Sequence, residues 1–496
     1  MNLRSPSPRR ATLGIIVGAA WIAGLFVAAP LVGGFGIVPI AEWIIIRSPG
    51  WLSTTAIELL GFYAQPALVI GLIAAILVAA AIAAVLWPAN AGRFTPVVLA
   101  VGTVATALLF LATGAGISVG FLGGLVIAVA SPYVAARILT ASPTVTTRRR
   151  FLRRVGGVAV AGAVATVGLR TLFGRFTADG DDRAEEPLDR PVSRPSGDPE
   201  FDFDGMPAAV TSPDDHYTVD ISVSNPTIDS EAWTLDIDGE VAQPYSLTYD
   251  ELLDHDESVE QTTTMLCISN EVGGDLIGTG HWTGVQLMDL VETAAPTDGA
   301  VDVVTHAADG YSEAIPLELV DREDILIAYG MGDRTLPTDH GFPVRLLVPG
   351  RYGMKMTKWI TRIEIADEEH EAHWEERGWD EEAVVNTMSY VRGAERDGDR
   401  VLVGGVAFGG LETGVEELEG VEVSVDGGDT WNEAELETQF AEHAWRRWRY
   451  AFEAPDRSEF EVVVRAIERD GTVQTDEETD PTPAGATGWH RQTLRI

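Results

Sequence analysis

The chain of 496 residues contains a single cysteine, Cys267. One cysteine cannot form a disulfide within the chain, and it cannot build a four-cysteine zinc site or a cysteine-ligated iron–sulfur cluster. Lysine is almost as rare, since only Lys355 and Lys358 occur. Histidine is absent before His216, so residues 1–215 cannot supply the two axial histidines of a b-type haem, and we expect no haem.

Acidic residues are scarce at one end of the chain and abundant in the rest. Residues 1–178 contain thirteen arginines and two acids, a formal charge of +11, whereas residues 179–496 contain 22 basic and 72 acidic residues, a charge of -50. An external surface this acidic repels the nucleic-acid backbone, which excludes nucleic acid as a partner. We also expect a halophilic source, because molar salt screens such self-repulsion.

Long apolar runs dominate residues 1–176 and predict an all-α transmembrane bundle. The runs approach the roughly 20 residues that a helix needs to cross a bilayer, and we predict five spans, at 11–33, 64–87, 95–113, 117–139 and 155–173. The stretch 43–63 fits an interfacial or re-entrant segment better. Few charged residues interrupt the spans, so they predict an anchor in membrane lipid rather than a transporter.

Most arginines near these runs lie in three places. They stand before the first span, between the second and third, and between the fourth and fifth. The positive-inside bias places these loops in the cytoplasm. Five crossings then put residues 179–496 outside it, which predicts a multi-pass protein of the cell membrane with a large extracytoplasmic part.

The loop before the last run, residues 147–153, reads Thr-Arg-Arg-Arg-Phe-Leu-Arg. It resembles the twin-arginine export signal, which serves proteins that fold around a cofactor before export. The alternative is an ordinary cytoplasmic stop for the span that follows. Cleavage near Phe176 would release the external part, because a span after such a motif can be a removable signal.

The external part divides by composition into a linker and two domains. Residues 177–205 are acidic and proline-rich, which predicts a solvated linker. Alternating strands mixed with amphipathic segments predict an α+β domain at 206–370. Strands separated by glycine turns predict a small β-sandwich at 371–496.

Two segments of the α+β domain carry the residues with chemical potential. Both lysines lie in residues 349–359, just after His340-Gly-Phe-Pro-Val-Arg345. This cluster predicts an anion site, in which lysine ammonium groups and an arginine guanidinium bind a phosphate and glycines let the backbone approach it. Cys267 ends a threonine-rich stretch and precedes a glycine-rich loop. A small buried hydrophobe is one interpretation, and a thiolate ligand to a soft metal is the other.

Together these segments resemble the sulfite oxidase family. The resemblance rests on Cys267, then Leu326-Ile-Ala-Tyr329, then residues 339–359, and residues 421–431 and 445–448 are similar to that family's immunoglobulin-like domain. It implies a molybdenum–molybdopterin cofactor and oxygen-atom transfer between Mo(VI) and Mo(IV). A small-molecule substrate, an external electron carrier (a blue-copper protein, a cytochrome or a quinone pathway) and a homodimer are further expectations.

The resemblance also assigns roles to individual residues. Cys267 would ligate molybdenum, Tyr329 would face the metal-bound oxo group, and Trp282 would form a pocket wall. The residues expected to hold the pterin and its phosphate are Asn270, His340, Arg345, Gly353, Lys355 and Lys358. For Tyr329 a core aromatic is the alternative interpretation.

The chain departs from the sulfite-oxidising members at the substrate pocket. Those members have arginines after the cysteine and in the first strand, whereas this chain has Ser269-Asn270-Glu271 and Tyr217-Thr-Val-Asp220. Sulfite oxidation and reduction of a neutral S-oxide or N-oxide both stay open. A non-catalytic, anchored binding protein is the alternative from a different class.

Overall fold

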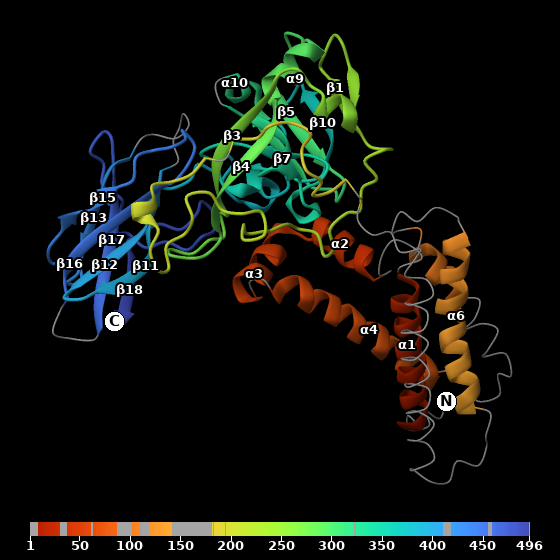
Figure 1. Cartoon of the computed structure of the whole chain (residues 1–496). Helices are drawn as coiled ribbons and strands as arrows, with labels where there is room; N and C mark the ends of the chain where they lie inside the picture. The colour runs from red at the N-terminus through yellow and green to blue at the C-terminus, as the bar shows by residue number, and fades with distance from the viewer. Residues whose placement is uncertain are drawn as a thin grey trace. The chain divides into compact units, whose positions relative to one another are not determined.

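A computed structural model describes residues 8–29, 37–60, 63–86, 102–109, 111, 119–140, 181, 183–193, 195–321, 324–409, 418–454 and 459–495. The chain separates into two compact units (Figure 1). The first comprises Met1–Asp179 with Ile221–Ser224, and the second comprises Gly180–Asp220 with Asn225–Ile496.

The first unit is helical. Its described helices are α1 (Pro8–Ala28), α2 (Val38–Arg47), α3 (Gly50–Leu60), α4 (Ala64–Leu86) and α6 (Val119–Thr140). Glycines let α1 approach its neighbours closely: a Cβ on Gly14 would lie 2.3 Å from the Ala80 carbonyl oxygen of α4, and one on Gly24 would lie 2.9 Å from the Ala128 Cα of α6. Small residues at such contacts are typical of helices that associate in membranes.

The prediction of five membrane spans is not supported. Among the described residues, two helices are long and apolar enough to cross a membrane by length and composition, Arg10–Ala28 and Ala64–Leu86. The described apolar stretch of helix α6 is the shorter Gly124–Val134, and the third predicted span is described in part, as helix, at residues 102–109. The fifth run and the arginine motif at 147–153 lie outside the described residues.

The stretch expected to be interfacial or re-entrant forms two short helices. Helix α2 has 10 residues and α3 has 11. At 1.5 Å per residue, each is about half the length of a membrane crossing.

The α+β part of the second unit contains two five-stranded sheets around one core. The first has the order β2-β1-β10-β5-β6, and the second has the order β3-β4-β7-β8 with β9 paired to β7. The strands are β1 (Thr234–Gly239), β2 (Tyr245–Thr248), β3 (Ser258–Leu266), β4 (Ile277–Gln286), β5 (Asp302–Ala307), β6 (Ser312–Pro316), β7 (Leu326–Met331), β8 (Arg334–Thr335), β9 (Arg345–Leu347) and β10 (Ile360–Ala366).

Short helices connect these strands: α8 (Tyr249–Leu253), α9 (Leu287–Ala294), α10 (Leu317–Val320), and the 3-10 turns η3 (Pro199–Phe201), η4 (Thr338–His340), η5 (Gly353–Lys355) and η6 (Glu375–Arg377). Helix α8 starts at a cap formed by its own side chains. The Thr248 hydroxyl accepts the Glu251 backbone N–H while the Glu251 carboxylate accepts the Thr248 N–H, a reciprocal cap that satisfies two backbone donors.

The C-terminal part consists of two antiparallel four-stranded sheets that share one core of valines around Trp448. Their orders are β11-β12-β16-β15 and β14-β13-β17-β18. The strands are β11 (Met388–Asp397), β12 (Arg400–Phe408), β13 (Leu418–Ser424), β14 (Asn432–Glu433), β15 (Glu435–Leu436), β16 (Arg446–Glu453), β17 (Glu459–Glu468) and β18 (His490–Arg495). Two sheets around one core agree with the predicted sandwich architecture.

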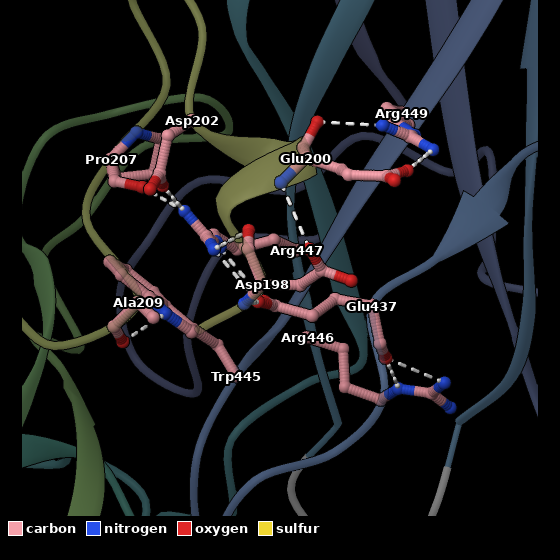
Figure 2. A network of polar contacts seen from close by, with 10 residues as sticks. All are labelled: Asp198, Glu200, Asp202, Pro207, Ala209, Glu437, Trp445, Arg446, Arg447 and Arg449. Atoms are coloured by element: carbon pink, nitrogen blue, oxygen red, sulfur yellow. Dashed lines mark hydrogen bonds and ion pairs between the residues drawn. The ribbon is translucent and has the colours of Figure 1, made fainter. Parts of the chain in front are cut away.

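The segment expected to be a solvated linker is extended but attached to both domains. Near its start, Leu188 N donates to Asp333 O at 3.0 Å in the α+β part. Further along, Arg447 of β16 donates to the carbonyl oxygens of Asp198 and Pro207, as Figure 2 shows. We call residues 183–209 the strap. Its polar composition correctly indicates exposure, but polar groups can also bind a neighbouring domain.

Candidate active site

Cys267 follows the last residue of β3, and its thiol is buried. Its backbone N–H donates to Leu276 O at 3.0 Å, which closes the loop 267–276. The Cys267 sulfur lies 3.0 Å from Ser269 Oγ. Burial raises the pKa of the thiol, while the Ser269 contact opposes this shift. A positive ligand would favour the thiolate at this position.

Aromatic and cationic side chains gather around Arg345 at the start of β9. Its guanidinium lies 5.2 Å from the centre of the Trp282 ring, and its Nη1 donates to His340 O at 3.2 Å. The His216 ring contacts both His340, at 5.6 Å between centroids, and Trp282, at 6.0 Å. Burial lowers the pKa of Arg345 to about 10, that of His340 to about 4 and that of His216 to about 3, because a low dielectric disfavours the charged forms.

Tyr217 connects this group to Cys267. Burial raises the pKa of its phenol well above the usual value, ionisation of Cys267 raises it further, and Arg345 lowers it. A Cβ on Gly353 would lie 3.0 Å from Tyr217 Oη and 3.6 Å from Leu266 O. The Gly353 backbone therefore lies next to the Tyr217 phenol and the end of β3, and a side chain at residue 353 would crowd both.

Several polar atoms of this group are buried without a hydrogen-bond partner among the described residues: Arg345 Nε, Tyr217 Oη and Trp282 Nε1. An unpaired buried donor costs roughly 1–3 kcal/mol, so three of them together are unusual outside a binding site. An anionic ligand rich in acceptors would pair with these donors. The residues present therefore fit a pterin with a phosphate.

The remaining predicted phosphate ligands behave differently from one another. Lys358 Nζ donates to Asp220 Oδ2 at 2.8 Å and to Asp339 O at 2.9 Å, beside the His340 segment. Burial is the main effect that lowers its pKa, with Asp220 opposing. His340 Nε2 lies 2.9 Å from Pro213 O. His340, Arg345, Gly353 and Lys358 are thus brought into one region with Trp282.

Lys355 is paired with two buried carboxylates. Its ammonium group lies between Glu313 Oε1 at 2.7 Å and Glu375 Oε1 at 2.6 Å. Burial raises the pKa of Glu313 to about 7, against the opposing effect of Lys355. These contacts anchor the segment 372–379 to the α+β part, and a contact of Lys355 with the phosphate stays a prediction.

Asn270 is also engaged by protein groups. Its Oδ1 accepts the Leu276 N–H at 2.9 Å, and its Nδ2 donates to the Tyr390 hydroxyl at 3.3 Å. The amide therefore holds the cysteine loop, and the prediction that it contacts the cofactor is not supported.

The Tyr329 hydroxyl is bonded near the start of β3. It donates to Ser258 Oγ at 2.9 Å and accepts from Arg190 Nη1 at 2.9 Å. Ser258 is the first residue of β3, and Cys267 follows its last. A strand rises about 3.3 Å per residue, so these ends lie roughly 30 Å apart. This geometry favours the core aromatic of the alternative interpretation, and the role of Tyr329 at the metal stays a prediction.

Sequence reasoning missed His216 and Tyr217 as members of the site. The available signal was local, because this aromatic pair stands three and four residues before Asp220, the partner of Lys358. Their distance of about 50 residues from Cys267 concealed the contact, which only the folded chain brings about.

Comparison with known proteins agrees with this arrangement. Residues 222–374 match the oxidoreductase molybdopterin binding domain, and residues 383–495 match the Mo-co oxidoreductase dimerisation domain. Fold and site thus define a molybdopterin-dependent oxidoreductase with molybdenum cofactor. The two matches, with sulfite oxidases among the relatives, support a molybdopterin oxidoreductase of the sulfite oxidase type.

Relatives within the family include animal and plant proteins. Mitochondrial sulfite oxidase of Mus musculus is 29% identical over 351 residues, covering 60% of this chain and 64% of the relative. The Homo sapiens protein is 28% identical over 348 residues with the same coverage. Nitrate reductase of Hordeum vulgare is 26% identical over 270 residues, 43% of this chain and 30% of that protein. The chain thus spans less than two thirds of these relatives.

The fold is also similar to that of a solved structure, the sulfane dehydrogenase of Paracoccus pantotrophus. The TM-score is 0.51 at 20% sequence identity, and the match covers 63% of this chain and 90% of the other. At this identity the likeness concerns the fold alone.

Proposed function

We propose that the protein is a membrane-anchored oxidoreductase that transfers an oxygen atom to or from a small sulfur- or nitrogen-containing substrate outside the cytoplasm. The observation that carries the proposal is the buried Cys267 thiol next to a group of unpaired buried donors around Arg345. When bound, the molybdenum cofactor supplies two-electron oxygen-atom chemistry. Cys267 would hold the metal, and Arg345, Lys358 and Tyr217 would orient the pterin.

A neutral substrate such as an S-oxide fits the charges best. Lys358 is paired with Asp220, and the next cation on the loop side, Arg392, is occupied by the carbonyl oxygens of Gly273 and Gly274. Glu271 is exposed on the loop itself. An anion such as sulfite would need cations that are not already neutralised. Sulfite oxidation, the activity in the relatives' names, is therefore the second candidate.

The partners follow from the reaction class. Two-electron chemistry in either direction needs an external electron carrier, and a blue-copper protein, a cytochrome or a quinone pathway would serve. The match to a dimerisation domain supports a homodimer formed through the C-terminal domain, for which we keep the immunoglobulin-like fold as a proposal. The apolar helices α1 and α4 support anchoring in a membrane.

Purified full-length protein should contain molybdenum and pterin in equal amounts with the chain. We expect Cys267→Ser to lower turnover by more than about 100-fold, because even outer-shell changes cost 10- to 100-fold. Ser269→Ala keeps the thiol and removes only its neighbouring hydroxyl, so turnover should fall much less.

Turnover would be measured with sulfite, sulfoxides and N-oxides and an artificial electron carrier. Activity with sulfite alone would favour the second candidate. A folded protein without molybdenum and pterin would contradict the enzyme proposal and leave the anchored binding protein.

A further inference from the structure

The loop 267–276 that carries Cys267 is held only partly by its own contacts. Asn270 N donates to Cys267 O at 3.0 Å, and Gly274 N donates to Glu271 O at 2.9 Å. Residues 271–276 are exposed or half-buried, and they contribute no fully buried apolar side chain. The position of this loop therefore depends on whatever it is bound to.

The C-terminal domain provides that attachment through Arg392 of β11. Its Nη1 donates to Gly273 O at 2.9 Å, and its Nη2 donates to Gly274 O at 2.6 Å. The Arg392 side chain is only 15% exposed, whereas its ion-pair partner Asp275, at 3.1 Å, is 99% exposed. The hydrogen bonds to the two carbonyl oxygens therefore contribute most of the attachment, because charge-assisted hydrogen bonds from a largely buried group are strong. The ion pair with Asp275 contributes little, because surface ion pairs are weak.

Two further residues of the same domain complete the contact. The Tyr390 hydroxyl accepts from Asn270 Nδ2 at 3.3 Å, and the Arg392 guanidinium lies 5.1 Å from the Tyr390 ring centre. The His490 ring lies against Gly273, where a Cβ would be 2.3 Å from His490 Nε2. Gly273 has a φ of +77°, so both its backbone and its neighbour require glycine.

Other contacts between the two domains do not involve this loop. Thr264 N donates to His443 O at 2.8 Å, and Trp445 N donates to Thr264 Oγ1 at 2.7 Å. These contacts hold β3 against the C-terminal domain when Arg392 is changed. The effect of Arg392 is thereby confined to the loop.

We infer that Arg392 is a positioning residue of the metal site, which fixes the Cys267 thiol from the C-terminal domain through the carbonyl oxygens of Gly273 and Gly274. The inference rests on the proposed function, in which Cys267 is the metal ligand. The C-terminal domain would then serve catalysis as well as dimer formation, since it sets the geometry of a ligand on the other domain.

The rate at which a reagent alkylates Cys267, the only thiol of the chain, measures how often the loop opens, and this measurement needs no cofactor. Full-length protein produced without the cofactor is treated with a thiol-alkylating reagent at fixed pH, well below its unfolding temperature. Arg392→Gln should raise the alkylation rate by about tenfold, because the loop opens more often without its charge-assisted bonds. Arg392→Lys should raise it less, since one point-charge donor remains.

Arg396→Gln is the matched control, because Arg396 lies on the same strand and its Nε donates to Gly398 O within the exposed hairpin. Its alkylation rate should equal that of the unmodified chain. Tyr390→Phe, which removes the contacts of the hydroxyl with Asn270 and with the Gly273 backbone, replaces Arg392→Gln if that variant fails to fold. In the cofactor-loaded enzyme, Arg392→Gln should shift the sulfur-to-molybdenum absorption band at unchanged molybdenum content.

An alkylation rate of Arg392→Gln equal to that of the unmodified chain, or an equal rise in Arg396→Gln, would overturn the positioning role. Absence of molybdenum from the unmodified protein would instead overturn the proposed function and leave the thiol measurement intact. The two failures are therefore distinguishable.

Discussion

The hydroxyl groups of Tyr329 and Tyr217 allow a test of which tyrosine belongs to the site. The Tyr329 hydroxyl is paired with Ser258 and Arg190, whereas the Tyr217 hydroxyl is buried without a partner. Tyr329→Phe should lower the free energy of unfolding by about 1 kcal/mol, with unchanged turnover and molybdenum content. Thermal unfolding and metal analysis would measure this.

The matched variant, Tyr217→Phe, should show the opposite pattern. The cofactor-free protein loses an unpaired polar atom and should unfold no more easily, while the loaded enzyme loses pterin retention or turnover. A loss of activity in Tyr329→Phe with none in Tyr217→Phe would restore the original assignment of Tyr329.

Residue types and spacing indicate which segments meet, but not which partners each side chain finds. His340, Arg345 and Lys358 stand in short, compact segments, and the structure brings them into one region with Trp282. The carboxylate partners of Lys355, Glu313 and Glu375, could not be predicted, because charge in a sequence does not indicate which carboxylates surround a lysine after folding. The roles of these residues toward the cofactor stay predictions.

At the scale of elements, the strap is held by one buried arginine of β16 and one half-buried arginine whose partners are exposed. Arg447 is fully buried and forms a two-point contact with Glu437, at 2.8 Å through Nε and 2.7 Å through Nη2. Arg449 contacts Glu200 and Glu435, whose side chains are 68% and 60% exposed. Figure 2 shows both arginines directed toward the strap.

Arg447→Met should lower the free energy of unfolding by about 3–5 kcal/mol, because Glu437 would keep a buried charge without its partner. Arg449→Met should cost less than about 1 kcal/mol, as exposed pairs usually do. Thermal unfolding gives the stabilities, and limited proteolysis shows whether the strap is released. Equal costs for the two variants would contradict the importance of burial.

Element types were predictable where local rules act, as at the capped start of α8 and in the alternating strands of the C-terminal domain. The attachment of the strap was not, because its contacts join residues about 240 positions apart. The composition of a loop predicts that it is exposed to water. It does not predict which of its carbonyl oxygens another domain will bind.

For the whole molecule, hydropathy predicts five spans, and two helices among the described residues meet the requirement of length and composition. The fifth predicted span lies outside the described residues, the third is described only in part, and the described apolar stretch of the fourth is Gly124–Val134. Apolar composition is necessary for a crossing, but a helix must also continue for about 20 residues.

The net charge of -39 leads to the last prediction, which concerns salt. Excess like charge destabilises a compact state through self-repulsion, and the screening length falls from about 10 Å at 0.1 M to about 3 Å at 1 M salt. Raising potassium chloride from 0.1 M to 2 M should therefore raise the unfolding midpoint of the detergent-solubilised chain by about 5–10 °C.

The effect should be the same for sodium chloride at equal ionic strength, because screening does not depend on the identity of the cation. Sucrose serves as the control, since it stabilises folded proteins by exclusion from their surface without screening charge. If sucrose and salt act alike at both low and high pH, exclusion explains the result. If lowering the pH toward the sequence pI of about 4.4 removes the response to salt but not the response to sucrose, self-repulsion of the acidic surface is its cause.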